Sequence, residues 1–94
     1  MNYKFREIYN LGNEEVEVEI KGFDTKKDAR EYMNSRVKDV KANNKEWKTY
    51  YQDSSDFFSE KELRLKSEIK KEEEGTFDIG ESKIYYVFEI ELIG

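Results

Sequence analysis

The stretch that decides the fold runs Lys83-Ile84-Tyr85-Tyr86-Val87-Phe88-Glu89-Ile90-Glu91-Leu92-Ile93. Its even-numbered side chains are all apolar or aromatic, as on the buried face of a β-strand, where side chains alternate between two faces. Its odd-numbered side chains are apolar at Tyr85 and Val87 and acidic at Glu89 and Glu91. A strand that is covered on both faces loses this alternation. We therefore expect the central strand of a sheet, whose second face is covered over part of its length by protein or by a partner.

The composition restricts the classes of function. The 94 residues suffice for a single domain, residues 1–94, and the 36% that are hydrophobic allow one modest core. The sequence contains no Cys, His or Pro. These absences exclude disulfides, a thiol nucleophile, and the most common general base and transition-metal ligand. We therefore expect a non-enzymatic protein without a catalytic site, a metal or a cofactor.

The sequence also lacks the usual membrane and export signals. No stretch approaches the roughly 20 apolar residues of a transmembrane helix. Residues 1–9 carry charges and alternate in polarity, unlike the apolar core of a signal peptide. We expect a cytoplasmic protein that does not associate with a membrane.

Residues 3–9 and 15–21 predict a β-hairpin, because residues 10–13 between them have turn chemistry. The second segment alternates strictly between apolar and acidic residues. Its apolar side consists of Val16, Val18 and Ile20, and its acidic side consists of Glu15, Glu17 and Glu19. We expect the apolar side in the core and the acidic side on the outer face of the sheet.

Charge pairing predicts the register of this hairpin. Opposite charges across two strands are favourable, so we expect Lys4 to face Glu19 and Arg6 to face Glu17. Glu7 then falls on the buried face. An edge position for the first strand is the simplest explanation for a carboxylate there.

Residues 25–43 predict a helix, which begins with a capping box at Thr25 and Asp28. Its apolar residues recur at helical spacing and predict one buried face: Ala29, Tyr32, Met33, Val37 and Val40. Residues 46–52 then predict a third strand, with one face formed by Trp47, Thr49 and Tyr51.

Residues 60–74 fit two structures. Ser59 and Glu62 match a capping box and favour a helix. A strand instead aligns the apolar side chains Leu63, Leu65 and Ile69 on one face. We favour the strand, paired with the last one so that Leu63 lies opposite Leu92, with the hairpin tip at residues 72–80.

The expected order of elements is therefore ββαβββ. Consecutive strands are mostly antiparallel neighbours, and one helix can cover one face of the sheet. This order predicts an α+β two-layer sandwich, with a mainly antiparallel five-stranded sheet and one helix packed on one face.

Acidic side chains on the outer face form the first candidate functional surface. We expect a partner-binding surface formed by Glu15, Glu17, Glu19, Glu89, Glu91, Tyr85 and Val87. An ordered array of carboxylates can imitate a phosphate backbone and occupy a basic groove. The alternative interpretation is a solvated face that keeps the protein soluble. Further acidic residues follow at Asp53, Asp56, Glu60 and Glu62.

A basic stripe on the predicted helix is the second candidate. An alternative nucleic-acid-binding surface would consist of Lys27, Arg30, Lys38, Lys41, Lys45 and Trp47. Basic residues beside an aromatic ring can follow a phosphate backbone and stack on a base. However, the whole chain has a net charge of −5, whereas nucleic-acid-binding domains are usually basic. Direct binding to nucleic acid is therefore the less favoured hypothesis.

Two further hypotheses come from the last strand and from the composition. Tyr85 and Val87 can form an apolar patch that is buried in a homodimer, which would make the chain a structural subunit. In its small size, its acidity and its lack of Cys, His and Pro, the chain resembles phage and mobile-element proteins that inhibit host nucleic-acid machinery, including anti-CRISPR proteins. The resemblance implies an inhibitor that imitates DNA and occupies the basic surface of a protein partner.

Overall fold

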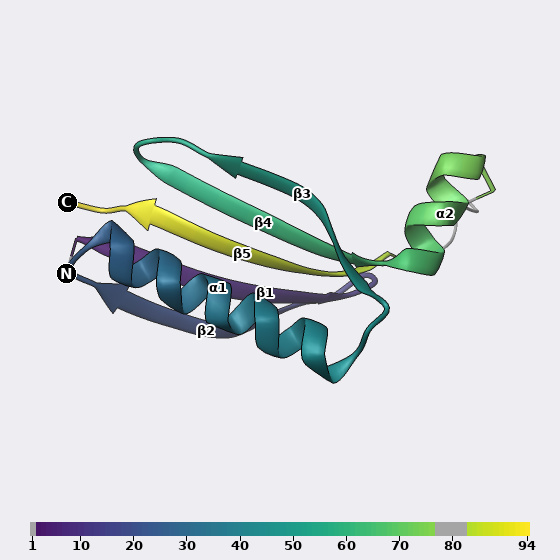
Figure 1. The fold of residues 1–94 in the computed structure, drawn as a ribbon, viewed down its shortest axis with the longest axis horizontal. Helices are drawn as coiled ribbons and strands as arrows, with labels where there is room; N and C mark the ends of the chain where they lie inside the picture. The colour runs from purple at the N-terminus through teal and green to yellow at the C-terminus, as the bar shows by residue number, and fades with distance from the viewer. Residues whose placement is uncertain (1, 77–82) are drawn as a thin grey trace.

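The computed structural model describes residues 2–76 and 83–94. Within these ranges the chain forms β1 (Tyr3–Leu11), β2 (Glu15–Phe23), α1 (Lys26–Asn43), β3 (Trp47–Ser54), β4 (Phe58–Leu65), α2 (Lys66–Glu74) and β5 (Ile84–Leu92). The five strands form one sheet in the order β2-β1-β5-β4-β3, and every pair of neighbours is antiparallel (Figure 1). The predicted α+β class, the five-stranded antiparallel sheet and the central position of residues 84–92 are confirmed.

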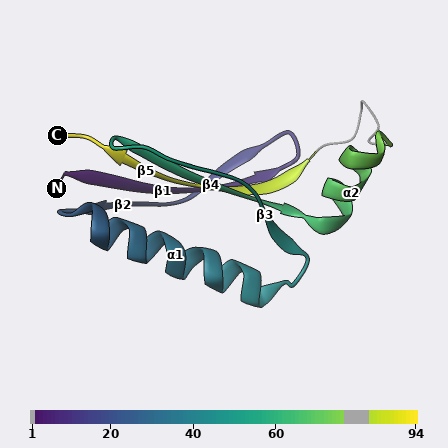
Figure 2. The same ribbon diagram turned by 45° about the horizontal axis from the view of Figure 1, so that its top comes forward.

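α1 covers one face of the sheet, which we call the helix face; the opposite face is the outer face (Figure 2). Thr25 caps this helix as predicted, because its Oγ1 accepts a hydrogen bond from the backbone N–H of Asp28 at 3.1 Å. The main core lies between α1 and the sheet and consists of Phe5, Ala29, Met33, Val37, Val40, Leu63, Phe88 and Ile90. α2 extends beyond one end of the sheet and does not cover the outer face (Figure 2).

Glu7 lies in the middle of the helix face and is 0% exposed. The guanidinium of Arg36 on α1 donates to both carboxylate oxygens, from Nε at 2.9 Å and from Nη2 at 3.2 Å. This contact raises the pKa of Arg36, chiefly through the hydrogen bond to Glu7. The predicted edge position is wrong, since β1 lies between β2 and β5. The partner that makes this buried carboxylate tolerable is an arginine on the helix.

The hairpin formed by β1 and β2 has a different register from the predicted one. Near the turn, Tyr9 pairs with Val16, but farther along Glu7 pairs with Glu19, so Val18 is an unpaired bulge residue. A one-residue shift transfers every following side chain to the opposite face. The predicted burial of the apolar side is therefore wrong: Ile20, for example, is 53% exposed.

β3 contains a second bulge, at Tyr50. Trp47 and Thr49 lie opposite Leu65 and Leu63 on the helix face, as predicted. After the bulge, Tyr51 lies opposite Glu62 on the outer face, so the prediction that all three residues share a face is wrong for Tyr51. Both bulges are in edge strands, where bulges are common.

The ambiguous segment is divided between the two predicted structures. It is a strand up to Leu65 and a helix from Lys66 to Glu74, so the order is ββαββαβ and the prediction of a single helix is wrong. Gly75 ends α2 in the left-handed conformation, with φ of 70°, and its N–H donates to the carbonyl of Glu72 at 3.2 Å. The predicted hairpin tip at residues 72–80 thus begins within α2, and the remainder falls partly outside the described residues.

The predicted register between β4 and β5 is wrong by several residues. Leu63 lies opposite Tyr86 instead of Leu92, although it keeps the predicted face. The capping box of the helical alternative does not form, because Ser59 is inside β4 and its hydroxyl lies 3.1 Å from that of Ser54 on β3. In the observed register, Phe58 at the start of β4 lies opposite Glu91 near the end of β5.

Candidate functional site

Three carboxylates lie side by side on the outer face. Glu89 on β5 is the direct cross-strand partner of Glu60 on β4, and Glu60 is the direct partner of Asp53 on β3. We call these three residues the acidic row. Arg6 on β1 continues the same line on the other side of Glu89. The antiparallel order of the four strands brings together side chains that are far apart in the sequence.

The acidic row is electrostatically unfavourable. Like charges in directly opposite positions of two strands repel each other. Burial raises the pKa of Glu60, and the neighbouring charges of Glu89, Glu62 and Asp53 raise it further. Within residues 2–76 and 83–94, neither Glu60 nor Asp53 forms an ion pair. This part of the outer face therefore keeps a surplus of negative charge.

Cations neutralise much of the outer face on the β1 side of the row. Arg6 lies 2.8 Å from Glu17 through Nε, and 3.9 Å from Glu89 through Nη1. Lys4 lies 3.8 Å from Glu91. These exposed pairs contribute little to the free energy of unfolding, but they do reduce the local negative potential. The centre of negative charge is consequently displaced from β1 and β2 toward β3 and β4.

The structure separates the five predicted acidic residues. Glu15, Glu17, Glu89 and Glu91 share the outer face, as the cross-strand register shows. Glu19 lies on the helix face because of the bulge at Val18, so its predicted outward position is wrong. Its two oxygens accept from the hydroxyl of Tyr32 at 2.6 and 2.7 Å, which raises the pKa of that tyrosine.

Tyr85 and Val87 also lie on the outer face, opposite Asn10 and Ile8 of β1. Val87 is only 8% exposed, and Ile8 beside it is equally buried. Tyr85 is partly covered by Arg64, whose Cζ lies 5.5 Å from the centroid of the ring. These apolar side chains therefore lie together on the outer face, but other side chains of this chain already cover much of them.

The basic stripe is only partly free for a ligand. Lys27, Lys38 and Lys45 are exposed along or just after α1. Lys41 donates to the hydroxyl of Thr49 at 2.7 Å, and Arg30 donates to the hydroxyl of Ser54. Trp47 packs edge-to-face against Tyr86 and Tyr9 at the border of the core, with centroid distances of 5.1 and 6.5 Å. These contacts engage the ring that the alternative hypothesis would stack on a base.

The sequence did not single out Asp53 and Glu60 as neighbours of Glu89. The available signal was their position in an acidic segment before the fourth strand, but only the register shows which carboxylates meet. Within the described ranges, no group of three or more His, Cys, Asp or Glu residues could hold a metal ion. The same ranges contain no helix with the length and apolarity to cross a membrane.

No protein-family model, curated protein or solved structure matches the chain.

Proposed function

We propose that this chain is a non-enzymatic protein-binding module whose acidic row docks on a basic surface of a partner protein. The observation that carries the proposal is the direct cross-strand contact of Glu89, Glu60 and Asp53 on the face that neither α1 nor α2 covers. Repulsion within the row raises the free energy of the isolated chain. A basic partner surface would relieve this repulsion. The free energy that the repulsion costs the isolated chain would then be recovered on binding.

The form of the row suits a partner that binds nucleic acid. Its carboxylates form a line across three strands, with further negative charge from Glu17 and Glu91. Neighbouring strands of a sheet lie about 4.8 Å apart. The phosphates of one DNA strand recur about every 3.4 Å along the helix axis, so the two spacings between charges are of the same order. We therefore propose that the module inhibits its partner by occupying the site for nucleic acid, as phage anti-defence and anti-CRISPR proteins do.

A matched pair of triple variants tests the proposal. Asp53→Asn, Glu60→Gln and Glu89→Gln together neutralise the row with almost no change in shape, and they should stabilise the fold. The control variant removes the same charge elsewhere through exposed residues: Glu14→Gln, Glu31→Gln and Glu74→Gln.

The measurement is capture of host proteins on the immobilised chain, followed by affinity measurement with each captured protein. We expect the row variant to lose binding by about a hundredfold, as for two lost charge-assisted contacts, while the control stays within about threefold. Added DNA should compete with the wild-type chain for the partner. Equal binding by the row variant and the wild type would contradict the proposal.

A further inference from the structure

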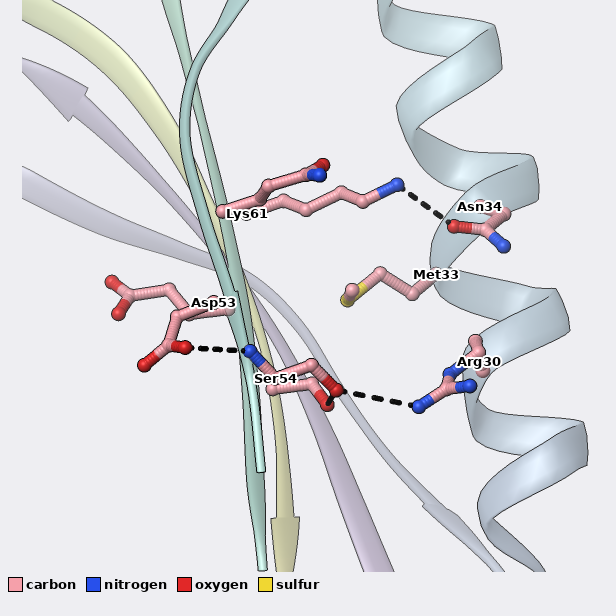
Figure 3. Close-up of a pocket in the computed structure, with 9 residues that line it drawn as sticks. Arg30, Met33, Asn34, Asp53, Ser54 and Lys61 are labelled. Carbon is pink, nitrogen blue, oxygen red and sulfur yellow. Dashed lines mark hydrogen bonds between the residues drawn. The ribbon is translucent and has the colours of Figure 1, made fainter. Parts of the chain in front are cut away.

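A cavity lies on the helix face, between the first half of α1 and the β3–β4 edge of the sheet (Figure 3). Its volume is about 420 Å³, within the usual range for small-molecule sites. It exists because Ser54 and Ser59 are direct cross-strand partners on this face, where larger side chains would fill the space. Met33 of α1 points between the two layers and forms an apolar floor (Figure 3).

Two cations border the cavity. Arg30 reaches across from α1, and its Nη2 donates to Ser54 Oγ at 3.4 Å. Lys61 reaches across from β4, and its Nζ donates to Asn34 Oδ1 at 3.1 Å. Figure 3 shows these two side chains on either side of Met33, both extended into the gap between helix and strands.

Both cations have only neutral partners. Among residues 2–76 and 83–94, neither Arg30 nor Lys61 forms an ion pair. The carboxylates of Asp53 and Glu60 do not fill this role, because strand alternation places them on the outer face. In Figure 3 the carboxylate of Asp53 points away from the helix.

The hydroxyl groups add neutral donors to the same cavity. Ser59 is 4% exposed, and its hydroxyl lies 3.1 Å from that of Ser54, so one of the two protons remains available for another acceptor. A cation lined up with hydroxyl donors beside an apolar floor is the arrangement that fits an oxyanion on a small organic molecule.

We propose that this cavity binds a small molecule through a phosphate or carboxylate group, held between Arg30 and Lys61. The hydroxyls of Ser54 and Ser59 donate to the same group, and Met33 contacts the apolar part of the ligand. The cavity lies on the helix face, although Asp53 and Glu60 of the acidic row also border it. The two proposals assign binding to different side chains, so either proposal can fail without the other.

The test is a titration of the isotope-labelled chain followed by amide NMR shifts, at constant ionic strength kept with chloride. One arm uses inorganic phosphate and the other uses acetate, so the two arms identify the preferred oxyanion. We expect saturable shifts of the amides of Arg30, Ser54, Ser59 and Lys61 in at least one arm. Shifts that are linear and spread over all the lysines and arginines would overturn the proposal.

Two variants assign the binding to the cavity. Arg30→Gln with Lys61→Gln should bind at least tenfold more weakly, as expected for the loss of hydrogen bonds to charged groups, at about 1.4 kcal/mol for each factor of ten. Lys27→Gln with Lys38→Gln removes the same charge from exposed positions and should bind like the wild type. If both variants bind equally well, Arg30 and Lys61 serve only to clamp the helix to the strands, and the proposal is wrong.

Ser59→Val provides a second test that changes no charge. It fills part of the cavity and removes one hydroxyl, so we expect it to abolish the saturable shifts while the remaining amide spectrum stays dispersed. Unchanged binding by Ser59→Val would overturn the proposal even if the double variant did not fold.

Discussion

Glu7 and Glu60 are the same residue type on opposite faces of one sheet, and their environments differ completely. Glu7 is fully buried on the helix face and receives two hydrogen bonds from Arg36. Glu60 is partly buried on the outer face and lies directly between Glu89 and Asp53. The first carboxylate is part of the interior and has a cation of its own. The second adds repulsion to the fold, which an external cation or protonation of the carboxylate can remove.

Removal of the Glu7 carboxylate should have the largest effect. In Glu7→Ala the guanidinium of Arg36 loses its main partner and a cavity remains on the helix face. We expect the free energy of unfolding to fall by about 3–5 kcal/mol, as when one partner of a buried ion pair is removed. Urea denaturation followed by circular dichroism measures the change.

Glu17→Ala is the matched control, because it removes an exposed carboxylate that also pairs with an arginine, Arg6. Its cost should be at most about 1 kcal/mol. Similar losses for the two variants would mean that burial does not distinguish the two faces. The double variant Glu7→Leu with Arg36→Met should be more stable than Glu7→Ala, since no unpaired charge remains inside.

Neutralisation of Glu60 should have a smaller effect of opposite sign. Glu60→Gln relieves repulsion from Glu89 and Asp53, so we expect it to stabilise the chain by a few tenths to about 1 kcal/mol at neutral pH and low salt. The gain should shrink as salt is added, because partly exposed charges are screened. The same urea experiment at two salt concentrations measures it, and a destabilised Glu60→Gln would contradict this interpretation of the acidic row.

The smallest effect is the pH dependence of that gain. Burial beside Glu89 raises the pKa of Glu60 in the folded chain above its unfolded value. Between the two pKa values the folded chain binds more protons, so the stability contributed at this position falls as pH rises through that window. The wild type and Glu60→Gln should therefore differ most above the raised pKa and converge below the ordinary one, near about pH 4. A difference that is constant from pH 3 to about pH 7 would contradict it.

The sequence by itself determined the elements whose pattern is local. Alternation placed residues 84–92 at the centre of the sheet, and helical spacing with the Thr25 cap placed α1 correctly. Together, the strand and helix patterns also predicted the α+β class. These features follow from side-chain periods of 2 and 3.6, which are visible in any window of ten residues or so.

Only the tertiary structure decided which side chains meet. One bulge residue in each edge strand, Val18 and Tyr50, reverses the faces that alternation predicts, and no local pattern announces a bulge. Arg36 reaches Glu7 across 29 positions of sequence. The acidic row and the cavity beside Arg30 both depend on the register of β3, β4 and β5, which the packing of the whole sheet against α1 determines.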